Sequence, residues 1–554
     1  MKISGVKIFL AAAASAAALS GCIGSKVNYQ DKDSMNNPIK IGWAKRSIVP
    51  AEGTAPITGQ FYLRVALEQR TPLLTSAMVM ENGKETVVFV SADMVSVPSE
   101  VLVIIKKLIA AEVPEIPVDN IIICATHTHA GPSAKGPEET PYPNKVDFIK
   151  QSGMCNFIAR QITDAIKEAW TKRDFGSISY GYGFAMTGYS RRTLYLDDIS
   201  KREAARPGVA MNGRGKMYGK TNDDMFDGYE AGTDAFINLF YTFDKSGKLT
   251  GAVVNVPCPS QTNGTAWYLH AGFWHNVREK LQKKYGDITI ITQSAAAGDL
   301  CPQQLHYLEA EKRRFRLKYP EMLKKYTENP MRYPEGFFPE KRNYLVQYAY
   351  DAMEFLRAED IADRIVTAFD EVLSWAGKEK FAAPVLKHEV RTLELARRTF
   401  PVELVAKEKA NHEKFMRQPY ITEGNKFAVL KHNSMLVKRR NRCGGVVARY
   451  QEQQKEPKLK TDIHVVRIGN IAFASNRFEL FMDYMHRIQA RSPFEQTVIV
   501  QLVTDLNGVG SYLATEEAIA NKGYSATPYC NQVSPKGGQE LVNETLKMLN
   551  EVNK

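Results

Sequence analysis

The sequence has few cysteines, no strong excess of either charge and, after its first residues, no long apolar run. Its seven cysteines in 554 residues show no regular spacing, which excludes a small scaffold held together by disulfides. The net charge of +12 is spread over the whole chain, and no nucleic-acid-binding motif accompanies it, so we expect no nucleic-acid partner. Beyond the N-terminal segment no run approaches 18 apolar residues, so no membrane-spanning helix is predicted.

The first residues have the organisation of a signal peptide. A basic segment with two lysines precedes a short apolar run at residues 8–19, which is too short to span a bilayer. The run leads into Leu19-Ser20-Gly21-Cys22. This motif resembles the lipobox of bacterial lipoproteins, in which the chain is cut before the cysteine and the cysteine is then acylated.

We therefore predict a signal peptide at residues 1–21, lipidation of Cys22 and a polar tether at residues 22–39. Together they predict a lipid-anchored protein of the bacterial cell envelope, on the periplasmic side or at the cell surface, with the membrane as a partner. An ordinary secretory signal followed by a chance cysteine is the alternative.

Apolar β-rich runs in the rest of the chain are continuous rather than alternating, a pattern typical of strands buried on both faces. Amphipathic stretches that predict helices separate several of them, at residues 100–113, 155–173 and 270–286. This order predicts an α/β fold with a mainly parallel or mixed sheet and flanking helices. The predicted strands cover residues 86–92, 120–124, 251–256, 288–292, 471–475 and 497–503.

One large domain is predicted for residues 40–554. Within it, residues 303–460 differ from the rest because they hold long charged helical stretches at 306–327 and 340–376 and a loop rich in proline and tyrosine. We interpret this segment as a helical insertion that covers the sheet. A helical stretch at 537–552 is the last predicted element.

Polar residues follow the predicted strands directly, and sites in such sheets form beyond the carboxyl ends of strands. His127 and His129 follow one strand. If their backbone is extended, residues i and i+2 point the same way, so both imidazoles can face one point. Imidazole is a common zinc ligand, although two histidines at this spacing can also be ordinary core or surface residues. The patterns HExxH and HxHxDH of other zinc hydrolases are absent.

The order of these motifs resembles the neutral/alkaline non-lysosomal ceramidase family, over its N-terminal catalytic domain. The most specific match is Thr126-His127-Thr128-His129-Ala130-Gly131-Pro132. The resemblance implies a zinc-dependent hydrolase that uses metal-activated water to cleave the amide bond of an N-acylated, ceramide-like substrate. The family's C-terminal immunoglobulin-like domain is not expected in this chain. Supporting matches lie at residues 41–50, 90–93 and 298–302 and around Glu479 and Tyr512.

The resemblance also implies roles for individual residues. His127 matches the family's first zinc ligand, and Glu479 and Tyr512 match its glutamate and tyrosine ligands. His129 matches the catalytic histidine beside the reaction centre. Arg191 loosely matches an arginine near the substrate.

Two cysteines stand where the family has other residues. Cys258 takes the place of the second histidine ligand, and Cys301 that of a serine in a GDxSP-type motif. Thiolate is a good zinc ligand, but its negative charge makes zinc a weaker Lewis acid than a second imidazole does. We therefore predict Cys258 as a ligand and Cys301 as a thiol near the scissile bond. Both can instead be buried structural residues, just as Glu479 can be a helix N-terminal carboxylate and Tyr512 a packed aromatic residue.

Two other functions agree with the same sequence. One is a hydrolase of a glycan, a peptide or another non-lipid substrate on this fold, with Cys301 as a nucleophile. The other is a non-catalytic lipoprotein that binds a ligand in the same cleft. Turnover of N-acyl lipids and of glycans, with and without a chelator, distinguishes the three.

Overall fold

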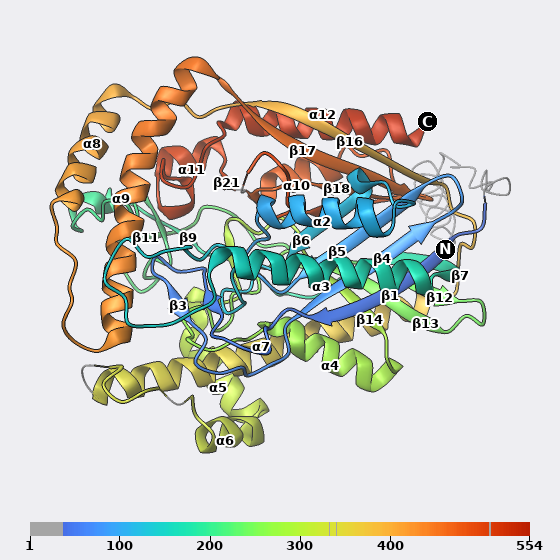
Figure 1. The fold of residues 1–554 in the computed structure, drawn as a ribbon, viewed down its shortest axis with the longest axis horizontal. Helices are drawn as coiled ribbons and strands as arrows, with labels where there is room; N and C mark the ends of the chain where they lie inside the picture. The colour runs from blue at the N-terminus through green and yellow to red at the C-terminus, as the bar shows by residue number, and fades with distance from the viewer. Residues whose placement is uncertain (1–36, 332, 339–340, 509–510) are drawn as a thin grey trace, which may run out of the picture. The chain divides into compact units, whose positions relative to one another are not determined.

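Figure 1 shows the computed structural model, which describes residues 37–554 except 332, 339–340 and 509–510. The predicted signal peptide, Cys22 and nearly all of the predicted tether lie outside these described residues. No helix of the described part is long and apolar enough to cross a bilayer.

An eight-stranded sheet forms the centre of the fold. Only two neighbouring pairs, at residues 86–92 with 121–125 and at residues 249–256 with 289–294, are parallel, and the other pairs are antiparallel. The sheet is therefore mixed, which confirms one of the two predicted arrangements. Its strand order is β14 (Thr289–Ser294), β13 (Leu249–Val256), β12 (Phe236–Asp244), β7 (Asp174–Phe184), β1 (Lys40–Ser47), β4 (Leu74–Glu81), β5 (Thr86–Ala92) and β6 (Ile121–Ala125).

A second, four-stranded sheet packs on one face of the first. Its order is β16 (Leu386–Ala396), β17 (Lys458–Ile468), β18 (Ile471–Ser475) and β20 (Gln496–Val500). Apolar side chains from both sheets form one shared core. The Phe473 ring lies between the two sheets, with its centroid 5.0 Å from that of Phe89 and 5.8 Å from that of Phe240. Burial on both faces explains why these strands are continuous apolar runs.

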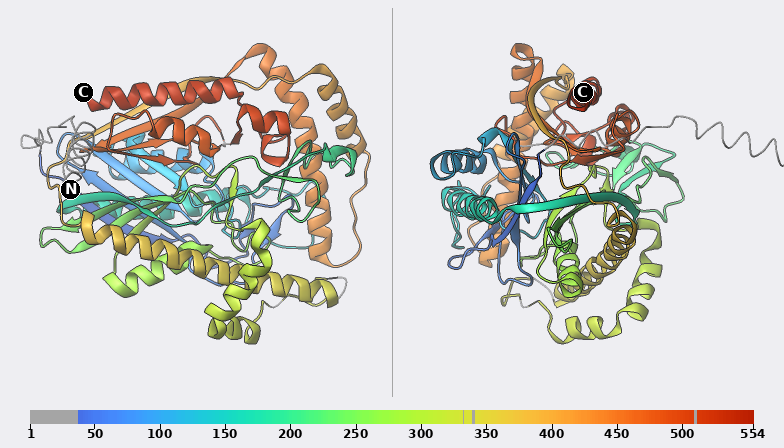
Figure 2. Two further views of the ribbon diagram at one scale, coloured as in Figure 1. Left: turned by 180° about the vertical axis from the view of Figure 1, so that it is seen from behind. Right: turned by 90° about the vertical axis from the view of Figure 1, so that its right-hand side faces the viewer.

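Helices cover the outer faces of both sheets, giving four layers, as the end-on view in Figure 2 shows. α3 (Gln151–Lys172) illustrates why they pack there: its buried residues Met154, Ile158 and Ile162 recur every four positions and form one apolar face against the large sheet. The covering helices are α2 (Ser99–Glu112) and α3 on one half of the large sheet, α4 (Phe273–Tyr285) and α7 (Lys341–Ala376) on its other half, and α10 (Met482–Gln489) and α12 (Pro535–Asn553) on the small sheet.

The described residues of the segment 303–460 are mainly helical, with one complete strand and the beginning of β17 at Lys458. The segment contains α5 (Leu308–Lys318), α6 (Pro320–Glu328), α7, α8 (Val402–Met416) and α9 (Lys426–Lys455). The strand is β16, which pairs along its whole length with β17. The sequence did not indicate β16 because one side of this edge strand is largely exposed, so polar and charged residues interrupt its apolar pattern.

Short paired strands fix the loops at the carboxyl ends of the long ones. β8 (Tyr189–Ser190) pairs with β15 (Leu300–Cys301), and β19 (Glu479–Leu480) pairs with β21 (Tyr512–Leu513). These pairs hold predicted site residues that are far apart in the sequence. The remaining short elements are β2 (Pro56–Ile57), β3 (Arg64–Val65), β9 (Arg192–Tyr195), β10 (Gly215–Met217), β11 (Phe226–Tyr229), α11 (Glu516–Asn521) and single 3-10 turns at 118–120, 199–201, 305–307 and 524–526.

Candidate active site

His127 lies in the loop that follows β6 and is almost fully buried. Its Nδ1 lies 2.8 Å from the carbonyl oxygen of Val95. A carbonyl only accepts, so Nδ1 carries a hydrogen. Its Nε2 lies 3.3 Å from Glu479 Oε2 and 3.3 Å from His129 Nε2. The Nε2 atom therefore faces a carboxylate and a second imidazole at once.

The two imidazoles do meet, but not through an extended backbone. His127 has a φ of 61°, in the left-handed region that residues other than glycine rarely adopt. The ring centroids of His127 and His129 lie 4.9 Å apart. The two imidazoles therefore face each other as expected, but the expected cause is wrong. A local turn at His127, and not an extended backbone, brings the rings together.

Two glycines of the matching motifs allow close packing around this loop. A Cβ on Gly131 would collide with the carbonyl oxygen of Asp93, and a Cβ on Gly298 would collide with that of Glu479. Each glycine therefore lets one site loop lie directly on the backbone of another.

Glu479 and Tyr512 are paired residues of β19 and β21. The Glu479 carboxylate faces His127 Nε2 at 3.3 Å and accepts a hydrogen bond from the Tyr512 hydroxyl. Burial favours the neutral acid, but His127, Arg191 and the Tyr512 hydroxyl outweigh it, so the pKa of Glu479 is lowered. Burial and the neighbouring Glu479 charge raise the pKa of Tyr512 well above its usual value.

Arg191 follows β8 and is buried. Its Nη2 donates to the Tyr512 hydroxyl at 3.1 Å and to the Gly298 carbonyl at 2.9 Å. Its Nη1 donates to Gln261 Oε1 at 3.2 Å. Arg191 thus ties together three loops of the site.

His129 is neutral in this surrounding. Burial lowers the pKa of its imidazole well below the usual value, and the nearby His127, Arg64 and Arg191 lower it further. Its Nε2 also lies 3.0 Å from Gln261 Nε2. Sequence reasoning missed Gln261. A signal existed, since Gln261 belongs to the same strand-end segment as Cys258, only three residues further on.

The structure does not bring Cys258 to this group. Its side chain is fully buried in the apolar core beneath α4 and α7, with Phe273 and Ile361. Its Sγ lies 3.5 Å from the carbonyl oxygen of Pro259, within its own loop. Burial raises the pKa of this thiol well above the usual value.

Cys301 is also buried but lines the site cavity. Its Sγ donates to the Gln303 carbonyl at 3.2 Å. Burial raises the pKa of Cys301 to about 11, so near neutral pH it is a thiol rather than the thiolate that attacks substrates. This chemistry argues against Cys301 as a nucleophile.

A cavity of about 430 Å³ opens onto His129, Arg191 and Tyr512. Its walls combine polar and apolar groups and include side chains from α7. Other residues that line it are Gln60, Tyr218, Gln261, Thr265, Cys301, Tyr350, Glu354, Arg357 and Tyr524. On the other side, a smaller cavity of about 140 Å³ reaches His127 and Glu479 together with Lys135 and Arg477.

The residue types around His127 fit zinc, although the predicted ligand set is not assembled. Among the residues that the structure describes, no group of three or more histidine, cysteine, aspartate or glutamate side chains is arranged as a metal site. Even so, His127 Nε2 faces the Glu479 carboxylate, with Tyr512 beside it, and its Nδ1 is held by a carbonyl, as is usual for a zinc-binding histidine. These atoms require a positive charge between them, either a proton or a metal ion.

Solved structures with a similar fold include ceramidases. The neutral ceramidase from Pseudomonas aeruginosa superposes with a TM-score of 0.58 at 15% identity, over 93% of this chain and 75% of that one. The chain has the fold of the neutral ceramidases. A ceramidase complexed with C2 gives a TM-score of 0.56 at 14% identity, over 94% of this chain and 76% of that one. No protein-family model and no curated protein matches the sequence.

This neutral ceramidase fold confirms the resemblance drawn from the motifs at the level of architecture. The motifs identified a fold that overall identity near 15% obscures, because the matching residues gather in a few strand-end loops. The predicted site residues that these loops bring together are His127, His129, Arg191, Glu479 and Tyr512.

Proposed function

We propose that the chain is a zinc-dependent hydrolase that cleaves the amide bond of an N-acylated, lipid-like substrate. The arrangement around His127 Nε2 carries the proposal. This atom faces a carboxylate oxygen and another imidazole nitrogen, each at 3.3 Å. Such a cluster of acceptors in a buried place requires a bound cation or proton. The fold shared with ceramidases supports amide hydrolysis as the chemistry.

In this proposal His127, Glu479 and Tyr512 hold zinc. Zinc bound there would supply a Lewis acid for the substrate carbonyl and for water. His129 accepts a proton at Nε2 from the nucleophile and returns it to the leaving amine. Arg191 holds the Tyr512 hydroxyl in place at 3.1 Å and presents a fixed positive charge to the substrate oxygen.

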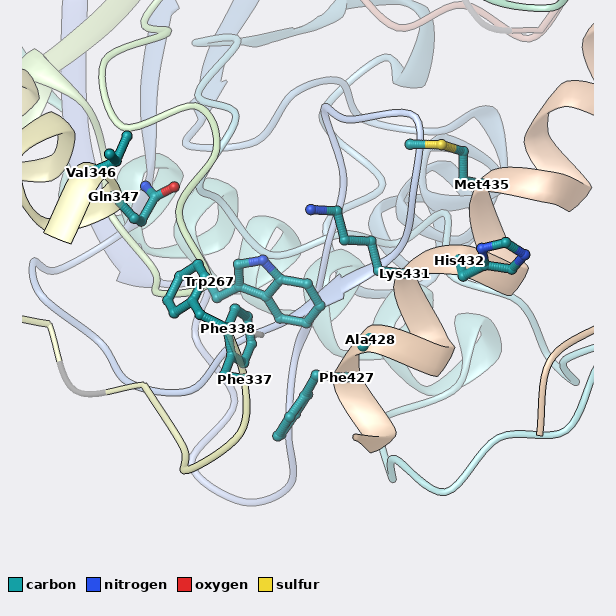
Figure 3. A pocket seen from close by; sticks show the side chains of 10 residues that line it. All are labelled: Trp267, Phe337, Phe338, Val346, Gln347, Phe427, Ala428, Lys431, His432 and Met435. Carbon is teal, nitrogen blue, oxygen red and sulfur yellow. The ribbon is translucent and has the colours of Figure 1, made fainter. Parts of the chain in front are cut away.

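The apolar part of such a substrate requires an apolar surface near the site cavity, and an aromatic groove of about 550 Å³ offers one (Figure 3). The Phe427 ring of α9 packs against both Trp267 and Phe337, with centroids 5.9 and 5.5 Å apart, and Phe338 and Ala428 also line this aromatic surface.

The groove is a neighbour of the site cavity. Gln347, a groove residue, donates to the hydroxyl of Thr265, which lines the site cavity, at 3.4 Å. We assign this groove to the acyl chain of the substrate. An acyl chain lying there would place its amide toward His129.

Filling the groove should discriminate between substrates by chain length. Ala428→Trp adds a large side chain at an exposed groove position of α9. We expect KM for a long-chain N-acyl substrate to rise about tenfold, the loss of roughly two buried methylenes at about 0.8 kcal/mol each. KM for an N-acetyl substrate should stay unchanged.

Ala448→Trp is the matched control, because Ala448 is exposed on the same helix and does not line the groove. A long-chain KM that Ala428→Trp leaves at the wild-type value, or long- and short-chain KM values that rise by the same factor, would contradict the assignment of the groove.

Hydrolysis and metal are tested on the purified chain with a panel of N-acyl lipids and a panel of glycans. We expect about one zinc per chain, turnover of an N-acyl lipid, loss of turnover with a chelator and recovery when zinc is added. Glu479→Gln should lose both zinc and turnover. Zinc content near zero with turnover that a chelator does not affect would rule out the metal. Turnover of glycans alone would favour the second candidate, a glycan hydrolase.

Lipid anchoring at Cys22 stays a proposal that rests on the Leu-Ser-Gly-Cys motif. Cell fractionation of a Cys22→Ser variant tests it, and a variant that remains in the membrane fraction and is processed as wild type would refute it.

A further inference from the structure

The side-chain amide of Gln261 lies between two polar groups of the candidate site. On one side, its Oε1 lies 3.2 Å from Arg191 Nη1 and 3.3 Å from the Tyr218 hydroxyl. On the other side, its Nε2 lies 3.0 Å from His129 Nε2. The amide thus connects a guanidinium to the imidazole that we place at the reaction centre.

The chemistry of these partners decides the orientation of the amide. A guanidinium only donates hydrogen bonds, so Arg191 bonds to the amide oxygen and not to its nitrogen. The Tyr218 hydroxyl donates to the same oxygen. The NH₂ group of Gln261 therefore faces His129. Because an amide NH₂ is also only a donor, His129 Nε2 is the acceptor.

We infer that Gln261 is a positioning residue that holds His129 in the tautomer with its hydrogen on Nδ1 and its lone pair on Nε2. His129 Nε2 is the nitrogen that faces His127. In the opposite tautomer, Nε2 would carry a hydrogen and could not take a proton from a nucleophile. The Gln261 amide is a neutral hydrogen-bond donor. The more acidic hydroxyl of a nucleophile can therefore replace it at the His129 Nε2 lone pair.

A second observation indicates that His127 and His129 have the same tautomer. The Val95 carbonyl keeps a hydrogen on His127 Nδ1, and Gln261 keeps one on His129 Nδ1. Both Nε2 atoms therefore point into the same space, 3.3 Å apart. The tautomer itself does not depend on the proposed function, whereas its consequence for catalysis rests on it.

Imidazole ¹⁵N NMR of histidine-labelled protein, recorded where imidazoles are neutral, reads the tautomer directly. We expect a protonated Nδ1 and an unprotonated Nε2 for His129, assigned by the signals lost in His129→Gln. His270 is an internal reference of opposite type, because its Nδ1 accepts from the Gly272 amide at 2.9 Å. Its hydrogen must therefore lie on Nε2.

Two variants test the role of the amide. Gln261→Glu replaces the NH₂ with an oxygen that only accepts, so His129 Nε2 should become protonated. Gln261→Met has no donor or acceptor of comparable strength, so His129 should show a mixture of tautomers. Unchanged His270 signals show that the fold is kept. If Gln261→Glu does not fold, the wild-type and Gln261→Met spectra still decide.

A wild-type His129 with its hydrogen on Nε2 would overturn the inference, as would variants that leave the His129 signals unchanged. In kinetics, Gln261→Met should lower kcat several-fold with little change in KM or in zinc content. If the tautomer shifts as expected but wild type hydrolyses no amide, the proposed function fails while the positioning role stands.

Discussion

The His129→Ala variant is expected to hydrolyse its preferred amide substrate with a kcat about 10²–10⁴-fold below that of wild type, because a positioned general base contributes roughly that factor. The imidazole is neutral, since burial and nearby positive groups lower its pKa, and its Nε2 points to the atoms that would hold zinc. KM and zinc content should change little, because His129 is not one of the three proposed ligands. Steady-state kinetics and metal analysis of the same preparation measure both.

Two further variants serve as controls for this measurement. Glu479→Gln should lose zinc together with activity, and His275→Ala, at a partly exposed position on α4, should behave as wild type. Retention of most of the wild-type kcat by His129→Ala would show that another group accepts the proton. Loss of zinc in that variant would instead make His129 a ligand.

Arg278→Met is expected to lower the free energy of unfolding by about 3–5 kcal/mol, because it leaves a buried carboxylate without its partner. Arg278 donates to Asp93 through both Nη atoms, at 2.6 and 2.9 Å, and the side chains are 7% and 0% exposed. Asp93 also accepts from the Leu74 amide at 2.8 Å. The pair joins the end of β5 to α4, directly beneath the loop that carries His127. Denaturant unfolding measures the change.

The matched control breaks a surface pair. Lys106 Nζ lies 2.7 Å from Asp119, whose side chain is 68% exposed, so Lys106→Met should cost at most about 1 kcal/mol. If both variants unfold at the same denaturant concentration, the buried pair contributes no more than a surface pair.

The elements that could be predicted from the sequence are those buried on both faces. The predicted strand at residues 86–92 coincides with β5, and that at 471–475 with β18. Their apolar runs are continuous, so no neighbouring context was needed to identify them. β16 is half exposed and carries charges along its length, and only its pairing with β17 makes it a strand.

The positions of site residues that belong to a family motif could be predicted from the sequence. The positions of residues that depend on a tight turn could not. His127, Glu479 and Tyr512 meet as the family resemblance implied. The strand-end segment after β13 differs, because tight turns reverse its direction: the Cys258 amide bonds to the Val256 carbonyl and the Gln261 amide to the Pro259 carbonyl. These turns send Cys258 into the core and Gln261 toward His129, an outcome that residue types alone do not encode.

The connection between β16 and β17 can vary in sequence more freely than the strands that hold Glu479 and Tyr512. These strands pair along their full length, yet residues 397–457, with α8 and α9, lie between them. Each doubling of such a loop adds only about 0.6 kcal/mol of closure entropy, so its length and sequence can drift without disturbing the strand register. One wall of the aromatic groove, from Phe427 to Met435, lies in this connection, whereas Glu479 and Tyr512 are held by the strands that follow. Under the proposed function, the preference for one substrate tail over another can therefore change while the reacting groups stay fixed.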